Sequence, residues 1–264
     1  MVGENLIFDP HVHVYPSSRE LPPEVKEAAL EYYLKTGLDI RRYANEEDLF
    51  QELDRLRIDK AFIVPRPAKD NSEAERINNY VSSLRRTYLD AFATVNPCQK
   101  GAIEELQRAI LELKLIGLMF DPHEQDIDFS SQEVWRLMEE VKILKIPIYI
   151  HLDFLKGEKI DIEGINEIIT CFSDINFIFS HFAKYEDKNI PSVLPEKNVY
   201  FDTSHVSEKF IENFIEQHGV DNLVYASDFK YNVYPVYEIE KIKNLNIGER
   251  DKRKIFYFNI SGLL

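Results

Sequence analysis

Short apolar runs alternate along the chain with longer segments in which apolar residues recur at helical spacing. Runs such as Ala61–Val64 and Ile148–Ile150 are apolar throughout, which is typical of strands buried on both faces of a parallel sheet. The expected strands are, in chain order, Asn5–Phe8, Lys60–Val64, Asp90–Val95, Leu115–Phe120, Pro147–Ile150, Asn176–Ser180, Val199–Asp202 and Asn222–Ala226.

The segments between these runs predict helices. Gln132–Leu144 has apolar residues at helical spacing, and Asp128, Ser130 or Ser131 can serve as its N-cap. The other expected helices are Pro23–Thr36, Glu46–Leu56, Ala74–Arg86, Ala102–Leu113, Ile162–Phe172, Glu208–His218 and Val236–Asn244, and the segment Arg250–Phe258 is expected to close the fold.

About eight strands, each followed by a helix, predict the α/β class and a (β/α)8 TIM barrel. An open, doubly wound sheet is the alternative arrangement. A length of 264 residues suits one barrel domain that spans residues 1–264. The extra helical segment before the second strand predicts a helical insertion after strand 1, a position from which insertions often cover the mouth of a barrel.

The charge balance narrows the class of partner. A formal net charge of -14 argues against nucleic acid and against an anionic membrane surface, because binding to phosphates needs clustered Lys and Arg. We therefore expect a small-molecule substrate, and the sequence leaves a homo-oligomer open. There is neither a signal-peptide pattern nor an apolar stretch of about 20 residues, so the cytoplasm is the expected location. Cys98 and Cys171 lack a short spacing and are expected to be buried thiols.

Histidines gather at the ends of the expected strands. In a barrel the carboxyl ends of the strands carry the function. Six of the 7 histidines lie at or just after such ends: His11, His13, His123, His151, His181 and His205. Asp228 follows the eighth expected strand in the same way.

The spacing of His11 and His13 has a direct physical meaning. Residues two apart on an extended strand point to the same side, so these imidazoles can bind one ion. Alone, the pair is equally consistent with two solvated side chains near a turn. Further strand-end residues strengthen the metal interpretation, although His151 could instead be a buried histidine bonded to backbone, and Asp228 a helix N-cap. His181 could be a ligand or a base.

The ordered set of motifs resembles the amidohydrolase superfamily, in the amidohydrolase-related branch that includes dicarboxylate lactone hydrolases and aromatic-acid decarboxylases. The motifs are Pro10-His11-Val12-His13, Ile150-His151, Ser180-His181-Phe182, Ala226-Ser227-Asp228 and the terminal Asn259-Ile260-Ser261-Gly262-Leu263-Leu264. The resemblance implies one divalent ion, with zinc ahead of manganese, iron and cobalt, and the ligands His11, His13, His151 and Asp228. It also implies that His181 orients or deprotonates the water on the ion and that Asp228 accepts its proton.

Two departures from the family pattern matter. Met119 occupies the place in which relatives often carry a Lys, and it cannot bridge two metals; Asp121 is the alternative bridge, but one ion is favoured. The last motif continues as Asp228-Phe229-Lys230-Tyr231 where relatives often have a Pro, which predicts an unusual substrate loop.

Four residues near the expected mouth are candidates for substrate binding: Arg66, Lys69, Lys230 and Tyr231. Cations there could hold a substrate carboxylate, and ordinary solvated surface is the alternative. Asp202, His123 and His205 could line the pocket or orient the ligands, and His123 and His205 could equally be bystanders.

The leading functional hypothesis is therefore a metal-dependent hydrolase that uses a metal-activated water to cleave an amide, lactone or ester of a small molecule bearing a carboxylate. One alternative is non-oxidative decarboxylation of an unsaturated or aromatic acid at the same site. The other is a non-catalytic metal- or ligand-binding barrel, against which the intact set of histidines and Asp228 argues.

Overall fold

The strands form two parallel sheets in the computed structural model, which describes residues 6–16, 45–151, 161–181, 196–229 and 235–263. The first sheet has the order β1-β2-β3 and the second the order β4-β5-β6-β7-β8-β9. The strands are β1 (Phe8–Val12), β2 (Lys60–Ile63), β3 (Leu89–Ala91), β4 (Ala93–Thr94), β5 (Leu118–Phe120), β6 (Ile148–Ile150), β7 (Phe177–Phe179), β8 (Val199–Asp202) and β9 (Leu223–Val224).

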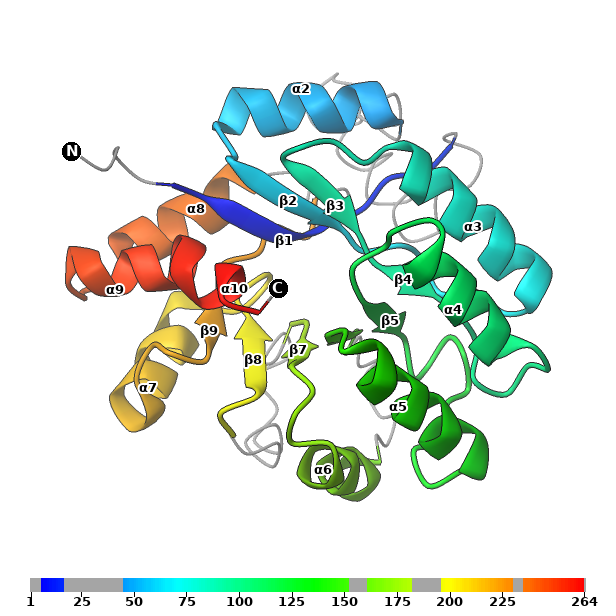
Figure 1. Cartoon of the computed structure of the whole chain (residues 1–264). Helices are drawn as coiled ribbons and strands as arrows, with labels where there is room; N and C mark the ends of the chain where they lie inside the picture. The colour runs from blue at the N-terminus through cyan, green and yellow to red at the C-terminus, as the bar shows by residue number, and fades with distance from the viewer. Residues whose placement is uncertain (1–5, 17–44, 152–160, 182–195, 230–234, 264) are drawn as a thin grey trace, which may run out of the picture.

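The two sheets join into one ring (Figure 1). On one side β3 and β4 continue each other through Phe92, whose N–H donates to Ile63 O at 2.9 Å, so the expected strand Asp90–Val95 is split in two. On the other side Val12 pairs with Phe229 in a parallel bridge. The structure thus confirms the (β/α)8 barrel and excludes the open sheet.

The interior of the ring is filled with large side chains. Phe8, Phe62, Phe92, Met119 and Tyr149 pack together there, with Ile260 and Leu263 from the C-terminal segment in the same cluster. This segment comprises α9 (Glu249–Arg253), a π-helix (Lys254–Phe258) and α10 (Asn259–Ser261), and it contains the residues Arg250–Phe258 that were expected to close the fold. It closes one end of the barrel (Figure 1), which leaves the carboxyl ends of the strands for the site.

Helices form the outer layer, and their sequence signals are local. Asn45, Ser131 and Ser207 each accept a hydrogen bond from a backbone N–H in the first turn of the helix that follows, so Ser131 is the N-cap among the three candidates. The helices are α2 (Glu46–Leu56), α3 (Asn71–Ser83), α4 (Ala102–Leu111), α5 (Gln132–Leu144), α6 (Ile162–Cys171), α7 (Glu208–His218) and α8 (Pro235–Asn244). The expected helix Pro23–Thr36 lies outside the described residues, and α2 is the described part of the insertion after β1.

Two other expectations need correction. The first strand runs through Asp9 to Val12, beyond the expected end at Phe8, because the Asp9 carboxylate is satisfied by the backbone N–H groups of His11 and Ser227 at 3.2 and 3.1 Å. Cys98 and Cys171 are exposed, since one lies in a turn and the other ends α6. Among the described residues, every helix is too short or too polar to cross a membrane.

Candidate metal centre

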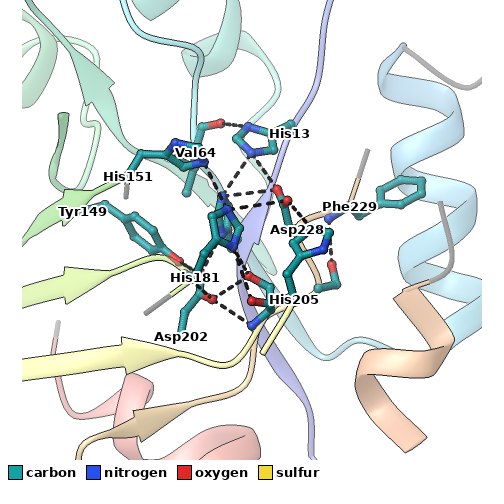
Figure 2. Close-up of polar contacts among 12 residues, drawn as sticks. His13, Val64, Tyr149, His151, His181, Asp202, His205, Asp228 and Phe229 are labelled. Atoms are coloured by element: carbon teal, nitrogen blue, oxygen red, sulfur yellow. Dashed lines mark hydrogen bonds and ion pairs between the residues drawn. The ribbon is translucent and has the colours of Figure 1, made fainter. Parts of the chain in front are cut away.

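Five side chains from four strand ends lie close together, and Figure 2 labels four of them, His13, His151, His181 and Asp228. The five are His11 and His13 from β1, His151 directly after β6, His181 just past β7 and Asp228 after β9. His11, His181 and Asp228 are buried, and the His151 side chain is 11% exposed. The barrel therefore gathers residues that lie up to 217 positions apart in the sequence, the separation between His11 and Asp228.

The distances between the facing atoms are short. The Nε2 atoms of His11 and His13 lie 3.0 Å apart, and Oδ1 of Asp228 lies 3.0 Å from Nε2 of His13 and 3.5 Å from Nε2 of His11. The Nε2 atoms of His151 and His181 lie 3.2 Å apart. Two overlapping groups have donor atoms within 4.8 Å of one another, namely His11, His13 and His151, and His11, His181 and Asp228.

The outer nitrogen of each β1 imidazole is bound to an acceptor. Nδ1 of His13 lies 2.7 Å from the carbonyl oxygen of Val64, and Nδ1 of His11 lies 2.7 Å from Oδ2 of Asp202. A carbonyl and a carboxylate only accept, so both Nδ1 atoms carry the hydrogen. The Nε2 atoms then present lone pairs to the centre of the cluster.

The same rule fixes the other two imidazoles. Nδ1 of His151 lies 3.2 Å from Oδ2 of Asp121. Nδ1 of His181 lies 2.9 Å from Oγ of Ser204, whose hydroxyl donates to Asp202 and therefore accepts from His181. Partners of this kind set the tautomer and orientation of metal-binding histidines.

The donors fit a divalent cation. Four imidazole lone pairs and a carboxylate face one another, an arrangement that is repulsive without positive charge between them. Oδ1 of Asp228 is buried and accepts no hydrogen bond from the described residues, although His13 Nε2 is close. A buried carboxylate oxygen without a donor is costly, and a cation would satisfy it. Imidazole nitrogen with one carboxylate oxygen suits zinc, manganese, iron or cobalt.

Burial and the facing imidazoles set the protonation states. Burial lowers the pKa of His181 well below its ordinary value of 6.5, so its imidazole is neutral. Burial would raise the pKa of Asp228, but its polar contacts with the surrounding histidines, among them the hydrogen bond with His205, outweigh that effect and hold it well below 3.8. Asp228 is therefore ionised, and an ionised carboxylate beside neutral imidazoles is the form of such groups that a metal ion binds.

Three contacting residues of the cluster have left-handed backbone conformations. The φ angles are 51° at His181, 59° at His205 and 52° at Asp228. Such values are uncommon for residues other than Gly and cluster at functional sites. Nε2 of His205 lies 2.8 Å from Oδ2 of Asp228, and the His205 and His181 rings lie 5.2 Å apart.

Comparison with known proteins agrees with this geometry. Residues 8–261 match the family model described as Amidohydrolase. The chain belongs to the amidohydrolase family. No protein with a curated description matches it.

Solved structures of similar fold cover nearly the whole chain. A dihydroxybenzoic acid decarboxylase from Polaromonas sp. JS666, with bound manganese and the inhibitor 2-nitroresorcinol, has 16% identity and a TM-score of 0.74, covering 98% of this chain and 97% of that one. A 5-carboxyvanillate decarboxylase from Sphingomonas paucimobilis has 15% identity and a TM-score of 0.71, covering 98% of each chain. A probable 2-pyrone-4,6-dicarboxylic acid hydrolase from Acinetobacter baumannii, with citric acid bound, has 14% identity and a TM-score of 0.67, covering 97% and 98%. At these identities the likeness shows the shared fold.

The structure separates the expected site residues into three groups. His11, His13, His151, His181 and Asp228 come together. Arg66 and Lys69 lie between β2 and α3, where Nη2 of Arg66 is 2.6 Å from Oε1 of Glu73 and the backbone N–H of Lys69 donates to Glu73 at 2.9 Å. Lys230 and Tyr231 lie outside the described residues, so a role of these four in substrate binding stays a prediction.

The sequence did not reveal some of the hydrogen-bond partners that orient the histidines of this amidohydrolase. Tyr149 and Ser204 both donate to Asp202, and the carbonyl of Val64 holds His13. Tyr149 lies in an apolar run and reads as core, and a backbone carbonyl has no signature in the sequence. Asp121, considered as a metal bridge, instead contacts the outer nitrogen of His151.

Proposed function

We propose that this chain is a metal-dependent decarboxylase that acts on an aromatic or another unsaturated carboxylic acid. One observation supports the metal dependence. The Nε2 lone pairs of the imidazoles converge near Oδ1 of Asp228, a buried oxygen that accepts no hydrogen bond from the described residues. Similar structures described as decarboxylases, one of them with bound manganese, support this reaction over the hydrolysis that the sequence favoured.

In this proposal His11, His13, His151 and Asp228 hold the ion. When bound, a divalent ion withdraws electron density from a substrate oxygen and stabilises the negative charge left by the loss of carbon dioxide. The bond from the unsaturated carbon to the carboxyl breaks, its electron pair stays on that carbon, and a proton must be delivered there. His181, with Nε2 3.7 Å from Oδ2 of Asp228, is placed to take a proton from water at Nε2 and to pass it to that carbon.

Hydrolysis of a carboxylate-bearing lactone, amide or ester is the second candidate. The observation in its favour is the neutral His181 imidazole, whose Nε2 lone pair faces the cluster and can accept a proton from an attacking water. The similar structure described as a probable 2-pyrone-4,6-dicarboxylic acid hydrolase adds support.

Metal analysis and a two-arm substrate panel test the proposal. Protein purified without added metals is analysed for bound ions, then loaded with Mn²⁺, Zn²⁺ or Co²⁺. One arm offers hydroxylated aromatic acids and other unsaturated acids and measures carbon dioxide; the other offers lactones, amides and esters and measures acid release. We expect carbon dioxide release that requires the ion and is lost in His11→Ala, while His218→Ala on α7 retains it.

The outcomes separate the alternatives. Acid release from lactones or amides without carbon dioxide release would replace the decarboxylase by the second candidate. A chain that binds no ion would refute the metal-dependent mechanism. A loaded protein without turnover in either arm would favour a binding barrel.

A further inference from the structure

His205 contacts the carboxylate oxygen of Asp228 that faces away from His13. Nε2 of His205 lies 2.8 Å from Oδ2 of Asp228, whereas Oδ1 faces Nε2 of His13 at 3.0 Å. A carboxylate only accepts, so His205 donates through Nε2–H. One oxygen of Asp228 is thereby occupied, and the other is left for an ion.

The backbone at His205 is held in an uncommon conformation. Its φ is 59°, which most residues other than Gly avoid, and the turn that carries it follows β8. A histidine in this conformation persists only where its surroundings support it. A side chain kept there against the backbone preference points to a role for the imidazole.

Helix α8 supplies that support. Glu238 accepts from the backbone N–H of His205 at 3.4 Å, and Lys241 donates through Nζ to the carbonyl of Thr203 at 2.7 Å. Glu238 and Lys241 also form an ion pair with each other, and both side chains are nearly buried. These contacts hold the turn that carries His205 against α8.

His205 also lies on the more open side of the cluster. Its side chain is 27% exposed, against 2% for Asp228 and 0% for His181. His205 is therefore the accessible partner in its contact with Asp228.

We propose that His205 is a positioning residue that holds Oδ2 of Asp228, so that Asp228 binds the ion through Oδ1 alone. The inference rests on the proposed metal-dependent function and deepens it. Binding through one oxygen would keep a coordination position of the ion for the substrate, whereas binding through both oxygens of Asp228 would occupy that position.

The test uses the full chain and measures how it binds the ion, independently of turnover. His205→Gly removes the donor at a position whose backbone suits Gly. His205→Asn also tolerates the left-handed conformation but is too short to place an N–H at the position of Nε2. His205→Gln can place its amide there and serves as the rescue variant. Mn²⁺ affinity is measured by calorimetry, and ligand number by the visible absorption of the Co²⁺-loaded protein.

We expect His205→Gly and His205→Asn to bind Mn²⁺ about 10- to 100-fold more weakly, because Asp228 is no longer held in place. We also expect their Co²⁺ absorption to be weaker, because Oδ2 of Asp228 becomes an additional ligand and a higher coordination number weakens this absorption. His205→Gln should recover most of the affinity and the spectrum. Lys145→Gly is the matched control, because Lys145 has a φ of 54° at the exposed end of α5 and should leave both readouts unchanged.

Two results would overturn the proposal, and they are distinguishable. If the natural chain binds Mn²⁺ while His205→Gly and His205→Asn match it in affinity and Co²⁺ spectrum, the role of His205 is refuted and the metal site stands. If the natural chain binds neither ion, the proposed function fails, and the role of His205 fails with it.

Discussion

Nδ1 of His11 lies 2.7 Å from Oδ2 of Asp202, and both side chains are fully buried. Asp202 also accepts from the Tyr149 hydroxyl and from Ser204, each at 2.5 Å, so one carboxylate ties together β1, β6 and the turn after β8. Burial would raise the pKa of Asp202, but its interaction with His11 outweighs this and holds the pKa well below its ordinary value. Asp202 is thus an ionised acceptor that keeps the Nε2 lone pair of His11 directed at the cluster.

Asp202→Asn should weaken metal binding without removing a ligand. The amide presents N–H groups where Asp202 has acceptors, so one of its donors is left unpaired or His11 changes tautomer. We expect a loss of about 1–3 kcal/mol in the free energy of unfolding and an affinity for Mn²⁺ lower by about 10- to 100-fold. Chemical denaturation and calorimetry measure the two effects. Asp221→Asn, which changes an exposed carboxylate paired with Lys254, is the control. Equal behaviour of the two variants would contradict the role of Asp202.

Metal removal should lower the thermal stability of the natural chain. An ion that binds only the native state at 100 times its Kd adds about 2.7 kcal/mol to the free energy of unfolding. For a chain of this size that corresponds to roughly 5–10 °C in Tm. Calorimetric scans with and without Mn²⁺ or Zn²⁺ measure the shift, and Mg²⁺, which prefers oxygen ligands, is the control ion. A shift as large with Mg²⁺ would argue against an imidazole-based site.

Most helices could be predicted because their signals are local. The convergence of the histidines with Asp228 could be predicted because strand ends are equivalent places in a barrel. Glu46–Leu56 and Gln132–Leu144 have the expected bounds, since each combines an apolar stripe with a capping residue directly before it. His151 and Asp228 were identifiable because all strands of a parallel barrel end at the same edge. Polar residues that follow apolar runs therefore meet.

Other features depend on neighbours that a sequence does not reveal. The break at Phe92 arises where the chain changes its pairing from β2 to β5, and nothing around that residue signals it. The left-handed backbone of His181 and His205 occurs without the Gly or Asn that would predict it. The brace from α8 depends on the tertiary approach of Lys241 to Thr203.

His181→Asn should separate the roles of base and ligand. Nδ1 of His181 is held by Ser204 and its Nε2 faces the cluster, so we assign it to proton movement. We expect kcat to fall by about 100- to 10,000-fold while one ion per chain remains bound. Elemental analysis and steady-state kinetics with a substrate found in the panel check this. Ser204→Ala removes the hydrogen-bond partner that keeps the hydrogen of His181 on Nδ1. It should lower kcat less than His181→Asn does and leave the ion in place. Loss of the ion in His181→Asn would instead make His181 a ligand.

Lys241→Met should destabilise the protein in a pH-dependent way. Burial raises the pKa of Glu238, and Lys241 partly offsets that rise. A carboxyl whose pKa is higher in the native state than in the unfolded chain binds its proton more tightly when folded. The free energy of unfolding therefore falls as pH rises from the ordinary glutamate pKa through the raised one. Without Lys241 the pKa of Glu238 rises further and the fall becomes larger.

At pH 7 the variant removes the positive charge that faces the buried Glu238 carboxylate, for which we expect a loss of about 3–5 kcal/mol. The loss should shrink near pH 4, where Glu238 is protonated with or without Lys241. Urea denaturation at both pH values measures it. The double variant Glu238→Gln/Lys241→Met carries no unpaired charge, so it should lose less and depend little on pH. Lys243→Met is the control on the same helix, because Lys243 pairs with Glu240 at an exposed position and should change the stability by less than about 1 kcal/mol. If Lys241→Met is no more destabilising than Lys243→Met, α8 does not brace the turn that carries His205.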